Sequence, residues 1–131
     1  MPRLSVWMIR TALLALAAGA TLGALLLAAP GIVGLTRWRP LHAELLLVGW
    51  TVQLAFGVAY WILPRYRRGP ERGHEAFGWA AYALVNVGML LVGLGRSVAG
   101  GEMWALAGRS AEGLAAAAFV AQAWPRVKPF R

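Results

Sequence analysis

The sequence predicts an all-α fold, an integral membrane four-helix bundle, on the basis of three observations. Of its 131 residues, 60% are hydrophobic and only 14% are charged, and the mean hydropathy is +0.60. The apolar residues gather in four stretches, each close to the roughly 20 residues that a helix needs to cross a bilayer. A helix satisfies its own backbone polar groups, as a lipid environment requires. We therefore expect one small transmembrane domain covering residues 1–131.

The helices are expected at residues 7–29, 40–63, 76–95 and 103–124. Pro30 and Gly31 end the first, because proline removes a hydrogen-bond donor and glycine loosens the backbone. Pro40 suits the first position of the second helix, and Pro125 closes the fourth. The first apolar run is longer than the core of a signal peptide, so we expect it to remain as a transmembrane helix.

The positive residues predict how the chain is oriented, because cytoplasmic loops of membrane proteins carry an excess of Lys and Arg. Nine of them fall at one face: Arg3, Arg10, Arg65, Arg67, Arg68, Arg72, Arg126, Lys128 and Arg131. The other four, Arg37, Arg39, Arg96 and Arg109, belong to the opposite face. Both termini are therefore expected in the cytoplasm, and His42 near the outer surface. The basic residues flank apolar segments, so the expected partner is the lipid bilayer and not nucleic acid.

The composition also excludes several chemistries. The chain has no cysteine, which excludes disulfides, thiolate metal sites, iron–sulfur clusters and covalently attached c-type haem. Its two histidines cannot build a three-histidine or a 2-His-1-carboxylate metal site. The short connections leave no room for a phosphate-cradling loop or a Ser/His/Asp arrangement. We do not expect the chain to be catalytic alone.

One face of the second predicted helix is chemically distinctive. At 3.6 residues per turn, a single line passes through His42, Leu46, Gly49, Gln53, Gly57 and Tyr60. The glycines make a flat groove with a nitrogen ligand at its outer rim, which fits either a porphyrin edge or another helix. In the first helix, Gly19 and Gly23 form a GxxxG step that favours close helix packing.

Polar residues inside the fourth predicted helix form a second feature. Arg109 and Glu112 are three residues apart, hence on one face, and Glu112 falls near the predicted midplane. Two interpretations stay open: a proton-relay or subunit-contact carboxylate, and a local ion pair packed beside Asn86 or Gln53. For Glu44, we expect a pairing with Arg96 or another arginine.

The stretch HAELLLVGWTVQLAFGVAYWILPRY, followed by FGWAAYALVNVGMLLVGLG, resembles transmembrane helices 2 and 3 of the catalytic subunit of haem-copper oxidases. The likeness is greatest to the nitric oxide reductase and cbb-type branch and to the small four-helix proteins related to it, and it covers residues 40–96. In that family the leading histidine is an axial haem ligand, so the resemblance implies that His42 binds a b-type haem. Small relatives open this helix with His-x-His, whereas this chain has Glu44 at the second position.

The resemblance leaves the second axial ligand open. The opposing histidine of the family belongs to a later helix that this chain lacks, and His74 lies beyond a helix that rises about 30 Å from His42. Met89, Met103, a second protomer and a five-coordinate iron are the alternatives. The resemblance also implies that Arg37, Arg39 and Arg96 contact the haem propionates, the alternative being lipid headgroups.

Two functions are therefore expected. The first is an oxidase-subunit-I-like module that binds a b-type haem, or an accessory module of a respiratory oxidase or nitric oxide reductase system, located in the inner membrane of a prokaryote. The second is a haem-free structural or assembly protein of the membrane. Either is expected to act as a homo-oligomer or as a subunit of a respiratory complex.

Overall fold

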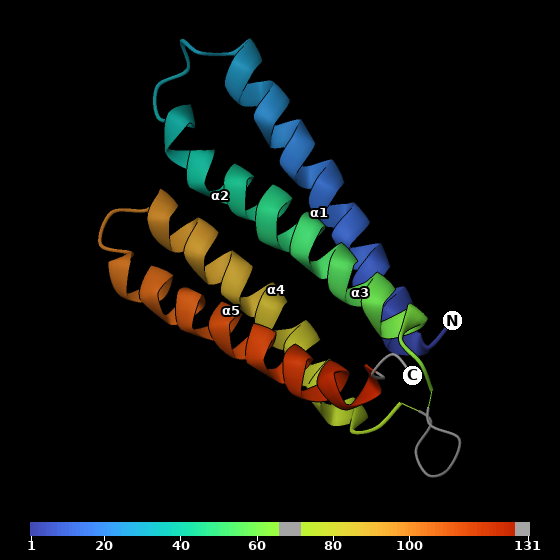
Figure 1. Ribbon diagram of the computed structural model, residues 1–131. Helices are drawn as coiled ribbons and strands as arrows, with labels where there is room; N and C mark the ends of the chain where they lie inside the picture. The colour runs from blue at the N-terminus through green and yellow to red at the C-terminus, as the bar shows by residue number, and fades with distance from the viewer. Residues whose placement is uncertain (66–71, 128–131) are drawn as a thin grey trace.

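The computed structural model describes residues 1–65 and 72–127, which fold into four long helical rods (Figure 1). The first rod is α1 (Arg3–Ala28), and the second runs without a break through α2 (Arg39–Glu44), the π-helical η2 (Leu45–Val52) and α3 (Gln53–Ile62). The third and fourth are α4 (Glu75–Ser97) and α5 (Glu102–Ala123), and the short 3₁₀ turns are η1 (Leu35–Trp38) and η3 (Trp124–Arg126). Arg67, Arg68, Lys128 and Arg131, which were counted for the orientation, lie outside the described residues.

The observed rods confirm the all-α prediction and the order of its four helices. The first rod begins four residues before the predicted start, because Leu4 and Ser5 are buried against the neighbouring helices and continue its packed face. Its end at Ala28 is consistent with the stop that Pro30 and Gly31 predict. The turn between α4 and α5 places Gly100 at a φ of 76°, which glycine adopts without steric cost.

Three of the rods are long and apolar enough to cross a membrane: Arg3–Ala28, Leu35–Ile62 and Glu75–Ser97. The chain is thus a membrane protein by length and composition. The fourth rod, α5, is not among them, because charged side chains interrupt a sequence that is rich in Ala and Gly. The prediction that this helix also spans the bilayer stays a prediction, as does the cytoplasmic location of the termini.

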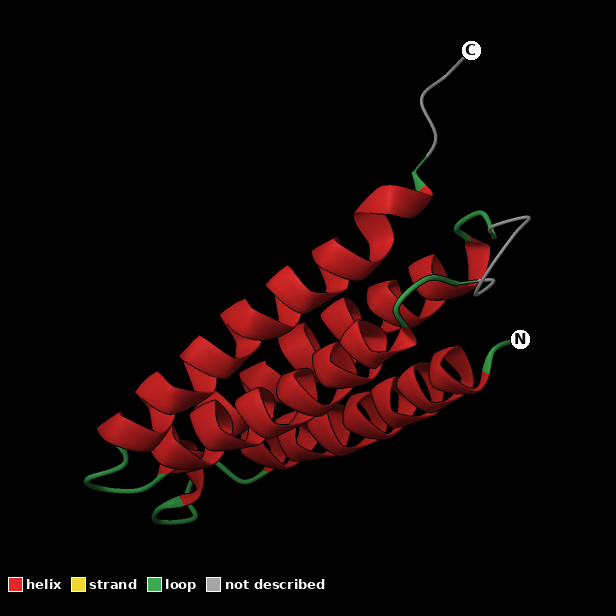
Figure 2. Ribbon diagram, turned by 90° about the horizontal axis from the view of Figure 1, so that it is seen from below, coloured by secondary structure: helices red, strands yellow, loops and turns green. Residues whose placement is uncertain are grey.

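The rods pack side by side in chain order. The α1 helix packs along the second rod, α4 lies against the second rod from the other side, and α5 packs along α4. Figures 1 and 2 show the four long axes running in one general direction, with the start of α1 and the end of α5 at the same end of the bundle. At that end all four rods contribute to one apolar core, made of Leu4, Met8, Tyr60, Ala81 and Phe119.

Glycines allow α4 and α5 to approach each other closely. A Cβ built on Gly88 would lie 2.9 Å from the Gly108 carbonyl oxygen, and one built on Gly108 would lie 2.7 Å from the Gly88 oxygen. Backbone therefore meets backbone at this crossing, as small residues permit between membrane helices.

Candidate functional site

His42 lies on α2 with its imidazole ring against α1. The ring Nδ1 is 2.8 Å from the Gly19 carbonyl oxygen. Because a carbonyl only accepts, Nδ1 carries the proton and donates it, which leaves a lone pair on Nε2. A Cβ built on Gly23 would lie 2.4 Å from the ring Cε1, so this glycine provides the space that the ring occupies. Both glycines of α1 thus position His42: Gly19 accepts its hydrogen bond, and Gly23 leaves room for its ring.

An open pocket lies beside the His42 ring, near the C-terminal end of α1. It is mostly apolar, and its lining consists of Ala20, Gly23, Ala24, Leu26, Leu27, Arg39 and His42. Of the residues that the resemblance implicates in haem binding, the structure brings His42 and Arg39 together here. In this lining His42 has the one side-chain atom that ordinarily ligates haem iron.

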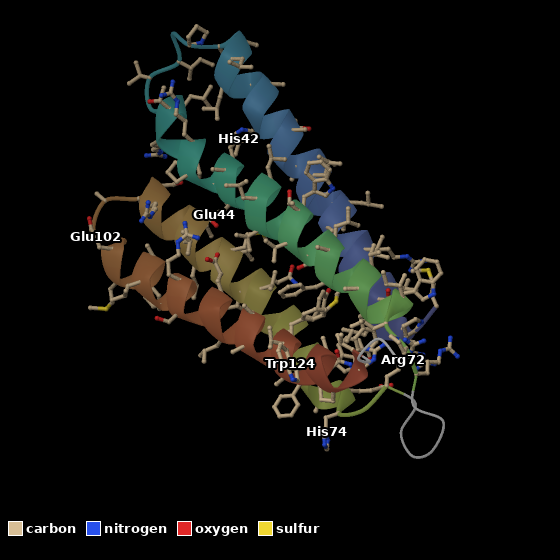
Figure 3. All side chains as sticks on the ribbon, in the orientation of Figure 1. His42, Glu44, Arg72, His74, Glu102 and Trp124 are labelled. Atoms are coloured by element: carbon tan, nitrogen blue, oxygen red, sulfur yellow. The ribbon has the colours of Figure 1, made fainter. Side chains whose placement is uncertain are left out.

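The other implicated residues lie elsewhere. Arg37 stacks over Trp38, with its Cζ 5.3 Å from the ring centroid, and does not line the His42 pocket. Arg96 lines a different pocket, between the ends of α2, α4 and α5, together with Arg109. Met103 is 74% exposed on α5. His74 precedes α4 at the opposite end of the bundle from His42 (Figure 3).

The two glycines of the predicted groove are covered by other helices. Gly49 lies between Ala15 of α1, 2.9 Å from a Cβ built there, and the buried side chain of Met89. Gly57 meets Met8 of α1, whose Cβ would be 2.9 Å from a Cβ built on the glycine. A porphyrin edge and another helix were the two expected occupants of the groove. In the structure another helix packs against both Gly49 and Gly57.

Hydrogen bonds join α1 to the second rod along this same face. Ser5 donates from Oγ to the Gly57 oxygen at 2.5 Å, and Gln53 donates from Nε2 to the Met8 oxygen at 3.3 Å and to the Thr11 hydroxyl. The His42–Gly19 bond is the third member of this series. The predicted polar face therefore serves as an interhelical seam.

Glu44 lies on the other side of α2 from His42 and joins an ionic network with α5 (Figure 3). The guanidinium of Arg109 contacts it twice, from Nη2 to Oε1 at 2.5 Å and from Nη1 to Oε2 at 3.3 Å. The same Nη1 donates to Glu112 Oε2 at 2.7 Å. The side chains of Glu44 and Glu112 are 8% and 14% exposed, whereas that of Arg109 is 45% exposed. Two nearly buried carboxylates thus share one guanidinium.

This network agrees with the Arg109–Glu112 pairing that the spacing predicts, and it adds Glu44 as a third member. The sequence predicted that Glu44 pairs with Arg96 or another arginine. In the structure its partner is Arg109. Asn86 takes no part in it, since its Nδ2 donates to the Tyr82 oxygen of its own helix at 2.8 Å. A proton-relay role for Glu112 stays a prediction.

Sequence reasoning missed a second cluster, at the end of the bundle where α3 stops. Arg126 is 1% exposed and donates to three carbonyls, those of Tyr60 at 3.0 Å, Leu63 at 2.7 Å and Pro64 at 3.1 Å. Arg72, 5% exposed, donates to the Tyr60 oxygen at 3.0 Å. Both had been counted as topology charges. The sequence feature that could have predicted this cluster is Pro64, because a helix that stops at a proline leaves carbonyl groups that need hydrogen-bond donors.

Comparisons with protein-family models, with curated proteins and with solved structures found no match to this chain. Within residues 1–65 and 72–127, no three His, Asp or Glu side chains gather as a metal-ion site.

Proposed function

We propose that this chain is a membrane-embedded module of the haem-copper oxidase type that binds one b-type haem through His42, without a complete catalytic centre of its own. The sequence of residues 40–96 suggests the family. The observation that carries the proposal is the hydrogen bond from His42 Nδ1 to the Gly19 carbonyl. Such a bond fixes the ring and its tautomer so that Nε2 is the ligating atom, as in many metal-binding histidines.

The surroundings of His42 fit a flat apolar group. Three small residues, Ala20, Gly23 and Ala24, line the pocket beside the ring, and a side chain at Gly23 would collide with the His42 imidazole. Arg39 belongs to the same lining and would hold a propionate, since guanidinium pairs well with carboxylate. When bound, a b-type haem supplies one-electron transfer. The protein's part is to ligate the iron, orient the ring plane and neutralise a propionate.

The pocket also favours a partner. Its described lining offers one ligating side chain and is open on one side, so a sixth ligand would come from another chain or be absent. This supports the proposal that the protein works as a homo-oligomer or as an accessory subunit of a respiratory complex. The proposed location is the inner membrane of a prokaryote.

An absorbance spectrum of the detergent-purified protein tests haem binding. Cells are supplied with 5-aminolevulinate, and the expected result is a Soret band in the wild type that is lost in His42→Asn. Asparagine carries its Nδ2 at the position of the imidazole Nδ1, so it keeps a donor for the Gly19 carbonyl but is not a haem ligand. Ser5→Ala is the matched control, because it removes an interhelical hydrogen bond far from the pocket. A colourless, folded wild type, also after added haemin, would exclude the proposal.

A haem-free structural or assembly role is the second candidate, and the series of interhelical hydrogen bonds favours it. In this case His42 acts as Ser5 and Gln53 do, by joining α1 to the second rod. The expected signature is a colourless protein in which His42→Ala lowers the unfolding temperature about as much as Ser5→Ala does.

A further inference from the structure

A polar pocket lies at the end of the bundle where α1 begins, α3 ends and α4 begins, opposite the His42 end. Its polar lining comes from Arg3, Arg65, Arg72, Glu75 and Tyr60. Figure 3 shows Arg72 at this end, beside the start of α1. The residues come from three segments, the start of α1, the end of α3 and the start of α4, so the fold, and not local sequence, assembles them.

Tyr60 contributes a donor that the described protein does not use. Its side chain is fully buried and lines the pocket, and its hydroxyl has no hydrogen-bond partner among residues 1–65 and 72–127. The ring is held firmly, with the guanidinium carbons of Arg72 and Arg126 at 5.6 and 5.2 Å from its centroid. Gly78 leaves room for its edge, 3.2 Å from a Cβ built on that glycine. A buried hydroxyl without a partner is costly, so an acceptor in the pocket would be stabilising.

The electrostatics of the pocket select an anion. Among residues 1–65 and 72–127, the charged groups that line the pocket are the guanidinium groups of Arg3, Arg65 and Arg72 and one carboxylate, that of Glu75. The helices α1 and α4 both begin here, and neither has a side-chain cap at its N-terminus, so two positive helix ends add to the same potential. The hydrogen bond from Arg72 Nη1 to the Tyr60 oxygen fixes one of these cations in place.

From these observations we infer that the pocket binds a phosphate group, held by Arg3 and Arg72 and by a hydrogen bond from the Tyr60 hydroxyl. A phosphate offers several acceptor oxygens around one centre, which matches donors that approach from different helices. The source is either the headgroup of an anionic phospholipid or free phosphate. The first fits a basic pocket between membrane helices, with Trp79 40% exposed at its rim. The inference is independent of haem binding.

The full-length protein in detergent provides the test. Apparent affinities are measured by native mass spectrometry and by thermal shift, using phosphatidylglycerol, phosphatidylcholine and inorganic phosphate as probes. Tyr60→Phe removes the hydroxyl and keeps the ring. Arg3→Gln removes one cation from an exposed position. Its effect on binding therefore does not depend on whether the core accepts phenylalanine in place of Tyr60. Arg10→Gln is the control, since Arg10 is exposed on the same helix and does not line the pocket.

We expect both pocket variants to weaken binding roughly three- to ten-fold, the loss typical of one hydrogen bond or one charge contact, while Arg10→Gln binds as the wild type does. Weakening for phosphatidylglycerol but not phosphatidylcholine identifies a lipid headgroup. Weakening for inorganic phosphate identifies free phosphate. The inference is overturned if the pocket variants bind both anions as tightly as the wild type, or if Arg10→Gln weakens binding equally.

Discussion

Arg109 of α5 and Glu44 of α2 form an ion pair across 65 positions of sequence, with Nη2 2.5 Å from Oε1. The pair ties the least apolar rod, which packs mainly along α4, directly to the second rod. Glu44 is also the last residue before the π-helical segment Leu45–Val52, where the backbone pattern of the rod changes. Such π segments are often found next to functional positions. The network therefore links α5 to the second rod next to the segment where the helical pattern changes.

Breaking this pair is predicted to destabilise the bundle. Arg109→Gln is expected to lower the free energy of unfolding by about 1–3 kcal/mol, because it leaves the nearly buried carboxylates of Glu44 and Glu112 without their shared cation. Glu44→Gln is expected to cost less, about 0.5–1 kcal/mol, because Arg109 is 45% exposed and keeps Glu112 as its partner. The double variant should lose less than the sum of the two, by about 0.5–3 kcal/mol. Unfolding in mixed detergent micelles, followed by circular dichroism, measures all four proteins. Glu102→Gln, exposed at the start of α5, serves as the neutral control. Strictly additive losses would show that the two side chains are not coupled.

The glycine crossing of α4 and α5 gives a second prediction. Alanine at Gly88 would place its Cβ 2.7 Å from Glu112 Cγ and 2.9 Å from the Gly108 oxygen, so the helices must separate. We expect Gly88→Ala to cost about 1–3 kcal/mol, as overpacking does elsewhere.

Gly113→Ala is the matched control on the same helix pair, because nothing lies within 4 Å of a Cβ built there. Alanine favours the helix over glycine, so this change is expected to leave the unfolding temperature unchanged or to raise it slightly. Equal destabilisation by both substitutions would argue against a close α4–α5 crossing.

The helices could be predicted from the sequence because their signals are local. Apolar runs of bilayer length and the prolines at positions 30, 40 and 125 fix the order and the approximate ends of the rods. The 3.6-residue period also identified the face of the second rod that carries His42, Gln53 and Gly57, and these residues do lie on one packed face. What covers that face depends on which helix lies next to it, and no local pattern contains that information.

Contacts between residues far apart in the sequence could not be predicted for the same reason. The spacing of Arg109 and Glu112 makes them neighbours on any helix, whereas the contact with Glu44 exists only once α5 and α2 are placed. Arg126 illustrates the point more sharply. A charge count treats it as a solvated topology signal, but a proline-terminated helix 62 residues earlier uses it as a hydrogen-bond donor.

Interhelical hydrogen bonding by Ser5 gives a third prediction. Ser5 is fully buried, and its Oγ donates to the Gly57 oxygen. We expect Ser5→Ala to lower the free energy of unfolding by about 0.6 kcal/mol and by no more than about 1.7, the range measured for such bonds between membrane helices. Ser110→Ala is the control, because this exposed hydroxyl donates to the Leu106 oxygen of its own helix. The prediction fails if the two substitutions have the same effect.

Arg126 gives the last prediction, because its role depends on the planar shape of guanidinium as well as on its charge. From Nε and Nη2 it donates to the carbonyls of Tyr60, Leu63 and Pro64 where α3 ends, and Arg72 is a further donor to the Tyr60 carbonyl. Lysine keeps the charge but has a single donor group and cannot reproduce the fork. Arg126→Lys is therefore expected to be destabilising by about 1–3 kcal/mol, the cost of losing charged hydrogen bonds to buried acceptors.

Arg126→Gln should be at least as destabilising as Arg126→Lys, and hydrogen exchange should accelerate at the amides of residues 59–63 in both variants while remaining slow in α1. If charge alone mattered, Arg126→Lys would behave as the wild type and only Arg126→Gln would unfold early. Arg10→Gln, which removes an exposed charge from α1, controls for the change in net charge. Destabilisation by both Arg126 variants but not by the control would establish that the buried arginine caps the end of α3 through its hydrogen bonds.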